Sequence, residues 1–109
     1  MGEYDGRLLI LVTTFGQRRQ AEEVVAQLVQ KNLVVCGQVG AGLTSYFRWE
    51  GKVECDEEVA VTLKIRDDRY EECLTCLRDL HPYQVPQLLS WPVTHVDDRY
   101  GRWAWEQAL

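Results

Sequence analysis

Both histidines and all three prolines of this chain lie between His81 and His95. Imidazole nitrogens bind copper and zinc, and they exchange protons near neutral pH. Proline fixes φ and keeps the preceding residue out of the helical region. The run from His81 through Tyr83 to Pro86 therefore predicts a stiff, extended strap that holds an imidazole and a tyrosine ring in set positions.

Two interpretations of the histidines stay open. In the first, His81, His95 and Cys36 are metal ligands. They would converge from different subunits, because no regular ligand spacing connects them along one chain. In the second, His81 hydrogen-bonds at the C-terminus of the preceding helix, where a polar or positive group is favourable, and His95 hydrogen-bonds at the end of a strand.

A C-x-x-C motif, formed by Cys73 and Cys76, is the next candidate for chemistry. Redox motifs of this kind sit at a strand-to-helix turn, where the helix N-terminus lowers the thiol pKa. This pair instead falls inside a helical pattern, with Cys73 on its apolar face. We expect buried or half-buried structural thiols, because cysteine is among the most buried residue types.

Aromatic residues suggest a second kind of site, a ligand groove between subunits. Aromatic side chains also dominate core and interface packing, so both interpretations stay open. The candidate groove residues are Tyr46, Trp49, Glu50, Lys64, Tyr83, Gln87 and Thr94. We expect the acidic run at positions 54–58 to be a solvated face of a hairpin.

The elements that position these residues follow from hydrophobic periodicity, turn signals and helix caps. Asn32 is expected to end the first helix, and Asp68 with Glu71 to form a capping box at the second. The predicted elements are a strand at 8–13, a helix at 17–31, a strand at 33–39 followed by a glycine kink at 40–42, extended chain at 43–49, a turn at 50–52, a strand at 53–65, a helix from 67, a strand at 88–94 and a short helical tail from 97.

This order predicts an α+β, ferredoxin-like βαββαβ sandwich with a long hairpin between its second and third strands and a C-terminal helical tail. Residues 1–109 form a single domain in this interpretation, with 1–6 as a loose N-terminus. Both helices would cover one face of the sheet. The other face would expose more apolar surface than a small monomer usually shows, so we expect a homo-oligomer.

Composition narrows the function classes. The net charge of −5 argues against general binding of nucleic acid, whose phosphates attract basic surfaces. No apolar run approaches the roughly 20 residues that cross a bilayer. The start of the chain carries no signal-peptide pattern, so we expect a cytoplasmic protein with reduced thiols. Nothing resembles a nucleophile triad, a phosphate loop or a catalytic acid–base pair, so no enzymatic activity is predicted.

Several motifs in the right order resemble the CutA family over roughly residues 7–106. They are Val35–Val39, Thr44–Lys52, His81–Pro86, Pro92–Thr94 and Trp103. The resemblance implies a homotrimer of ferredoxin-like subunits with a link to tolerance of divalent cations, chiefly Cu²⁺. It implies no settled enzymatic activity.

The chain departs from the family pattern at several positions. Gln87 stands where members often carry glutamate. Copper ligands proposed for some bacterial members, a cysteine and two histidines, correspond to Thr13, Leu80 and His81, so only one of the three is retained. Two functions therefore follow: a trimer that binds divalent metal, copper first, or a trimer that binds a small molecule or protein in signalling and has no direct metal role.

Overall fold

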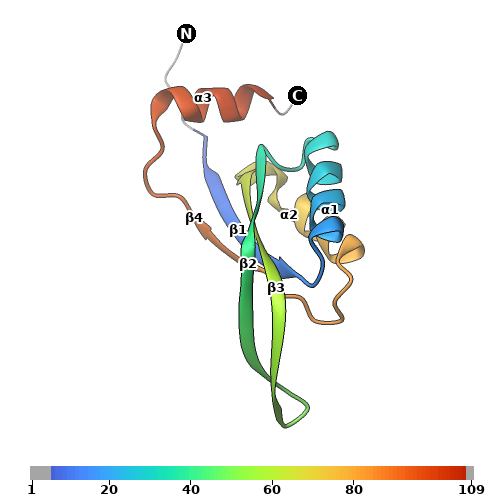
Figure 1. Ribbon diagram of the computed structural model, residues 1–109. Coiled ribbons are helices and arrows are strands. Elements are labelled where there is room, and N and C mark those ends of the chain that lie inside the picture. Colours follow the sequence, from blue (N-terminus) through green and yellow to red (C-terminus); the bar gives the residue numbers. More distant parts are fainter. Residues whose placement is uncertain (1–5, 108–109) are drawn as a thin grey trace.

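The structure is a computed structural model that describes residues 6–107 (Figure 1). Its four strands form one antiparallel sheet in the order β2-β3-β1-β4. The elements of the described range are β1 (Leu8–Phe15), α1 (Arg18–Gln30), β2 (Cys36–Trp49), β3 (Lys52–Arg66), the 3₁₀ turn η1 (Asp67–Arg69), α2 (Tyr70–Leu80), β4 (Leu89–Pro92) and α3 (Asp98–Gln107). This confirms the predicted ferredoxin-like α+β fold with a long β2-β3 hairpin.

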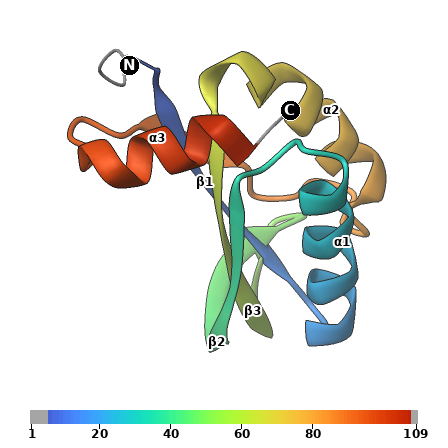
Figure 2. The same ribbon diagram turned by 90° about the horizontal axis from the view of Figure 1, so that it is seen from above.

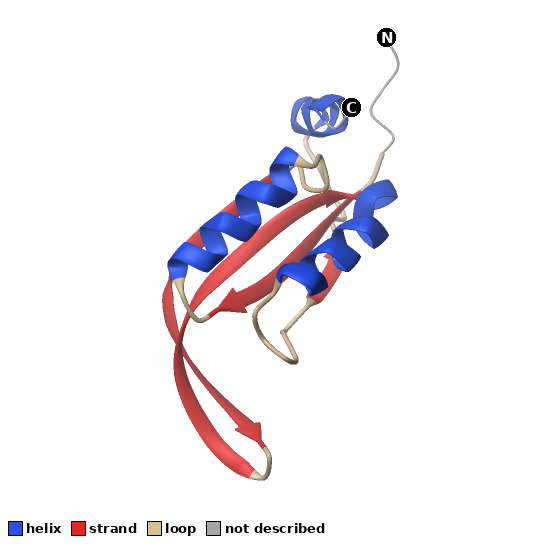
Figure 3. Ribbon diagram, turned by 90° about the vertical axis from the view of Figure 1, so that its right-hand side faces the viewer, coloured by secondary structure: helices blue, strands red, loops and turns tan. Residues whose placement is uncertain are grey.

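The core lies between the sheet and the two helices α1 and α2, which cover the same face (Figure 3). Central strand β1 pairs with β3 in a register that places Leu11 opposite Leu63. Successive residues of a strand face opposite sides of a sheet, so every second side chain of these strands points toward the helices and is buried. The fully buried members of this core include Leu11, Phe15, Leu28, Leu63, Ile65 and Leu77.

Helix α1 ends where the sequence predicts. Asn32 has φ of 58°, in the left-handed region that asparagine tolerates better than most residues. The N–H of Leu33 donates to the Leu28 carbonyl and the N–H of Asn32 to the Val29 carbonyl, each at 3.0 Å. These two bonds form a Schellman motif, which satisfies carbonyls that the helix would otherwise leave unpaired.

The β2-β3 hairpin projects well beyond the helices and gives the folded chain its 55 Å length (Figure 1). Glu50 and Gly51 both have positive φ, as a two-residue type I′ turn requires. The predicted kink is a shift of register between Val39 and Gly42. The predicted strand start at Leu33 is wrong, because β2 begins at Cys36, while Leu33 and Val34 enter the core.

Two further predictions are corrected at the ends of elements. The capping box does not form, because Asp68 lies in η1 and pairs with Arg66 at 2.5 Å, and no side chain caps α2. Strand β4 covers only Leu89–Pro92 instead of 88–94. Pro92 has no N–H for the ladder, and only the N–H of Val93 continues the pairing, to the Leu8 carbonyl.

Helix α3 crosses the end of the sheet, near the start of β1 (Figure 2). Its N-terminus is capped by Asp97, whose carboxylate accepts hydrogen bonds from the N–H groups of Arg99 and Tyr100. Arg66 lies over the Trp105 ring at 4.2 Å and donates to the Trp105 carbonyl. Gly6 packs closely against Trp105, since a Cβ at residue 6 would lie 2.0 Å from the ring. Residues 1–5 lie outside the described residues.

Candidate functional site

The strap that follows α2 brings His81 into the core at the C-terminal end of β1. The side chain is only 6% exposed, and its ring stacks on Phe15 with 4.2 Å between centroids. Nδ1 accepts a hydrogen bond from the Tyr83 N–H at 3.2 Å, so the proton of the neutral ring is on Nε2. That N–H donates to the Thr14 carbonyl at 3.0 Å, with Thr13 Oγ1 at 3.1 Å.

His81 is therefore a buried anchor of the strap. Burial lowers its pKa below the ordinary value, against the opposing effects of the Thr14 carbonyl and the Glu58 carboxylate. The neutral form is the one that the bond from the Tyr83 N–H to Nδ1 requires, because a protonated Nδ1 cannot accept a hydrogen bond. The imidazole ring does not bond the C-terminus of α2, as one of the two interpretations expected. Only the backbone N–H of His81 donates there, to the Leu77 carbonyl.

A second anchor joins the strap to the base of the hairpin. Tyr83 donates its hydroxyl hydrogen to Glu58 Oε2 at 2.5 Å, and Thr14 donates to the same oxygen at 3.0 Å. Partial burial alone would raise the pKa of Glu58, but hydrogen bonds from Ser45, Tyr83 and Thr14 outweigh it, and the pKa lies below its usual value. Burial and the adjacent Glu58 raise the pKa of Tyr83. Glu58 is therefore an ionised acceptor held by neutral donors.

The hairpin and the strap enclose a groove of about 900 Å³, which we call the hairpin–strap groove. Among the residues predicted for a groove, it brings together Tyr46, Trp49, Tyr83 and Gln87. The other three lie elsewhere. Glu50 forms the hairpin turn, Lys64 donates to Gln38 at 3.0 Å on the sheet, and Thr94 is exposed beyond β4.

Sequence reasoning missed the acidic wall of this groove. Glu54, Asp56 and Glu58 line it; Glu54 and Asp56 are exposed, as expected of a solvated face, and Glu58 is half-buried. Their i, i+2, i+4 spacing on a strand places them on one face of the sheet, and that spacing could have identified them. Phe47 pairs with Glu54 across the hairpin, so an aromatic ring lies beside this wall.

The three predicted metal ligands do not come together within one subunit. His81 is buried at the C-terminal end of β1, Cys36 starts β2, and His95 is exposed between β4 and α3. Burial raises the pKa of Tyr100 of α3, with a smaller contribution from the Cys36 thiol. Within residues 6–107, no three His, Cys, Asp or Glu side chains are grouped to hold a metal ion.

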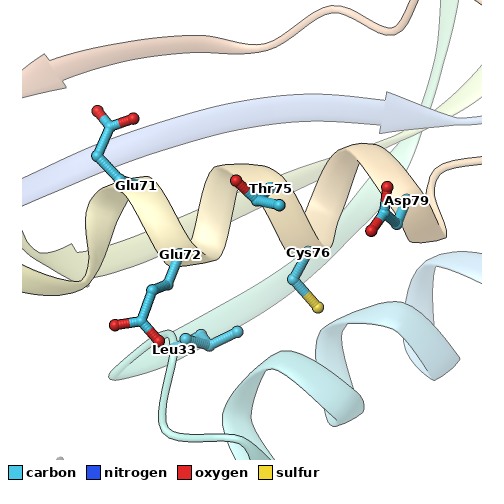
Figure 4. Close-up of a pocket in the computed structure, with 6 residues that line it drawn as sticks. All are labelled: Leu33, Glu71, Glu72, Thr75, Cys76 and Asp79. Atoms are coloured by element: carbon cyan, nitrogen blue, oxygen red, sulfur yellow. The ribbon is translucent and has the colours of Figure 1, made fainter.

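A shallower hollow of about 470 Å³ lies along the outer side of α2 (Figure 4). Glu72 and Cys76 point to the side where Leu33 lies, while Glu71 points away from them. The Lys31 ammonium is 3.7 Å from the Cys76 sulfur. Burial raises the pKa of the Cys73 thiol to about 12, so Cys73 is an unreactive packing residue.

Fold and groove together define a class: a small ferredoxin-like α+β protein with an extended hairpin and a groove where the strap meets that hairpin. The sequence model of the family described as CutA1 divalent ion tolerance protein matches residues 9–107. The chain belongs to this family.

Individual relatives agree with this assignment. The divalent-cation tolerance protein CutA of Pyrococcus horikoshii is 37% identical over 100 residues, which cover 92% of this chain and 97% of the relative. The crystal structure of CutA1 from Pyrococcus horikoshii superimposes with a TM-score of 0.87 at 35% identity, over 93% of this chain and 98% of that one. The structure of the periplasmic divalent cation tolerance protein CutA from Archaeoglobus fulgidus has the same fold, with a TM-score of 0.89 at 24% identity over 94% and 99% of the two chains.

Proposed function

We propose that this divalent-cation tolerance protein acts as a homotrimer, and that its ligand site is the hairpin–strap groove. The observation that supports a ligand site is the convergence of two chain segments on one groove, each fixed by its own anchor. His81 secures the strap to β1, and the Tyr83–Glu58 hydrogen bond secures it to the hairpin. A preformed groove with aromatic walls and few polar groups is typical of ligand sites.

The homotrimer proposal is supported by the sheet face that α1 and α2 leave uncovered. Val12 and Ile10 of β1 lie on this face, opposite Leu89 and Trp91 of β4. Leu89 is 57% exposed and Trp91 is 48% exposed. Both β2 and β4 are edge strands. Exposed apolar faces and free edges favour association, and the number of subunits follows from the resemblance to CutA.

Light scattering tests this assembly, with Trp91→Glu as the disruptive variant and Val29→Glu as the matched control. Val29 is also exposed, at 40%, but belongs to α1 on the opposite side of the sheet. We expect three chain masses for the natural protein and for Val29→Glu, and a smaller species for Trp91→Glu. A natural protein with the mass of one chain would overturn the homotrimer proposal.

The described residues do not fit a metal centre within one subunit. Both ring nitrogens of His81 are engaged in hydrogen bonds, so a metal ion would have to break one of them. Thr13 and Leu80 stand at two of the copper-ligand positions proposed for some bacterial CutA members. This also argues against a metal centre, since the Leu80 side chain has no atom that can bind a metal. We therefore place ligand recognition in the groove.

Copper binding between subunits is the second candidate function. It is favoured by Cys36, a free and only half-buried thiol, and by the exposed imidazole of His95. Thiolate and imidazole are suitable donors for copper. Calorimetric titration with Cu²⁺ tests it: saturable binding per chain that is lost in both Cys36→Ser and His95→Gln supports an inter-subunit site. Binding that is absent, or unchanged in both variants, counts against it.

We place the protein in the cytoplasm. All four cysteines are free thiols, which fits a reducing compartment. No helix within residues 6–107 is long and apolar enough to cross a membrane. Fractionation of the source cells followed by immunodetection tests this placement, and recovery in the periplasmic fraction, where the Archaeoglobus fulgidus relative is described, would refute it.

A further inference from the structure

Strand β2 is one residue longer than its partner strand between the core and the hairpin turn. Val39 packs against the core and pairs with Val61, and at the turn Trp49 pairs with Lys52. Ten residue steps along β2 therefore face nine along β3. Core packing fixes the first pair and the two-residue turn fixes the second, so the hairpin must hold an extra residue somewhere between them.

The extra residue lies at the base of the hairpin, as a β-bulge. Gly40 and Ala41 together oppose Ala60, and regular pairing resumes at Gly42. The position matters because side chains alternate along a strand, and a shift by one residue moves each of them to the other face. If the bulge lay nearer the turn, the side chains between Gly42 and the bulge would lie on the opposite face of the hairpin.

The observed position places the apolar residues of β2 on the face of the sheet that α1 and α2 leave uncovered. Leu43 pairs with Glu58, and directly paired side chains point to the same side. Glu58 accepts a hydrogen bond from Thr14, which lies on that uncovered face. Phe47 and Trp49 follow Leu43 at even spacing and therefore share its side. These three side chains are 36% to 40% exposed and continue the apolar face that we propose for association.

Hydrogen bonds on both sides of the sheet hold the bulge in this position. On the side of the helices, the Arg18 guanidinium at the start of α1 donates to the Gly40 carbonyl. A bulge disrupts the ladder locally, so this donor satisfies a carbonyl of irregular backbone. On the other side, Ser45 donates to Glu58, which requires both side chains on one face. A bulge displaced toward the turn would carry Ser45 to the opposite face and break this bond.

We propose that Arg18 is a positioning residue that pins the bulge at Gly40, and that it thereby presents the apolar side of the hairpin to a second copy of the chain. In the alternative conformation the bulge is displaced along β2, and Leu43 and Phe47 turn to the opposite face. The pinning depends on contacts within one chain. Its consequence for assembly rests on the homotrimer proposed above, because the apolar strip is continuous with the exposed face around Trp91.

Disulfide formation with the native Cys55 reports the position of the bulge. In the observed register Tyr46 pairs with Cys55. Counted from the two-residue turn, this is a non-hydrogen-bonded pair, whose Cα separation of about 4.5 Å suits a disulfide. With the bulge displaced toward the turn, Ser45 would take the place of Tyr46. Tyr46→Cys should therefore cross-link to Cys55 in the observed register, and Ser45→Cys only after displacement.

Oxidised glutathione serves as the oxidant, since it takes two electrons from the two thiols and leaves as two molecules of reduced glutathione. Peptide mapping by mass spectrometry identifies the bond. The test variant is Arg18→Gln and the matched control is Arg19→Gln, each combined with Ser45→Cys. Arg19 is the next residue of α1 and, like Arg18, forms an i, i+4 ion pair with a glutamate.

We expect the bond between Ser45→Cys and Cys55 to form about fivefold faster with Arg18→Gln, as for loss of one exposed hydrogen bond, and to change less than about twofold with Arg19→Gln. Arg18→Lys keeps a charged donor and should restore most of the natural rate. Equal rates in Arg18→Gln and Arg19→Gln would overturn the pinning role. So would failure of Tyr46→Cys to cross-link to Cys55 in the otherwise natural chain.

Light scattering in rising urea tests the consequence for assembly. We expect Arg18→Gln to dissociate into smaller species at a lower urea concentration than Arg19→Gln, and equal concentrations would refute the role in assembly. A natural protein with the mass of one chain would refute the proposed homotrimer, whereas the cross-linking rates would still decide the pinning role.

Discussion

Replacement of Tyr83 by phenylalanine tests whether the strap is held to the hairpin as described. The change removes only the hydroxyl that donates to Glu58 at 2.5 Å and leaves the ring in place beside His81. A hydrogen bond to a charged group contributes about 1.5–3 kcal/mol to stability. Both side chains are half-buried and Glu58 keeps its bond from Thr14, so we expect a loss near the lower end, about 1.5 kcal/mol.

Urea unfolding followed by circular dichroism measures this loss, at one protomer concentration because an oligomer unfolds in a concentration-dependent way. Tyr46→Phe is the matched control. Tyr46 lines the same groove but is 74% exposed, and its hydroxyl has no hydrogen bond in the described range. We expect its unfolding free energy to change by less than about 0.5 kcal/mol.

A double-mutant cycle with Glu58→Gln isolates the contact itself. Residues in one hydrogen-bonded network show interaction energies of about 0.5–3 kcal/mol, and we expect about 1 kcal/mol for this pair. The reasoning is refuted if Tyr83→Phe costs no more than Tyr46→Phe, or if the two changes at Tyr83 and Glu58 are simply additive. Either result would mean that the strap is positioned by packing and by His81 alone.

Two further predictions concern the other anchor and the end of α1. Burial lowers the folded-state pKa of His81 below 6.5, so the unfolded chain takes up the proton first as the pH falls. The contribution of His81 to the free energy of unfolding should therefore be fully present above pH 6.5 and be lost as the pH drops through the folded-state pKa. Unfolding free energies measured across this window should show a flatter pH dependence in His81→Asn, and equal slopes would contradict the assignment. Asn32→Ala should lower the free energy of unfolding by about 1 kcal/mol, because alanine is strained at φ of 58°, and Asn32→Gly should lower it less. A thermal unfolding series in which the alanine variant is more stable than the glycine variant would count against the Schellman geometry.

Much of the fold is predictable from local pattern. The apolar residues of α1 recur with helical spacing, those of β3 alternate, and the structure buries those same faces. The turn at Glu50–Gly51 and the end of α1 at Asn32 depend on φ preferences of a few adjacent residues. The errors lie at element ends, where partners outside the helix or strand compete: Asp68 pairs with Arg66, two residues before it, instead of capping α2.

The candidate site was predicted only in part for the same reason. The proline pattern indicated the strap, and the residue types indicated Tyr83 and Trp49 as groove residues. Nothing local indicated that Glu58, 25 positions before Tyr83, would accept its hydroxyl hydrogen. The acidic run is solvated surface as its pattern suggests, except at Glu58, which the strap reaches through Tyr83.

The elements, their buried faces and the stiff strap are local consequences of the sequence, since they follow from periodicity, turn chemistry and the fixed φ of proline. The role of His81 depends on the folded chain, because the same residue in the same sequence is equally compatible with a metal ligand. Nδ1 accepts a local bond from the Tyr83 N–H, two residues away, but Nε2 reaches the Thr14 carbonyl only because the fold brings the strap against β1, over a separation of 67 residues. A partner at that distance is selected by packing of the whole chain, and no local preference encodes it.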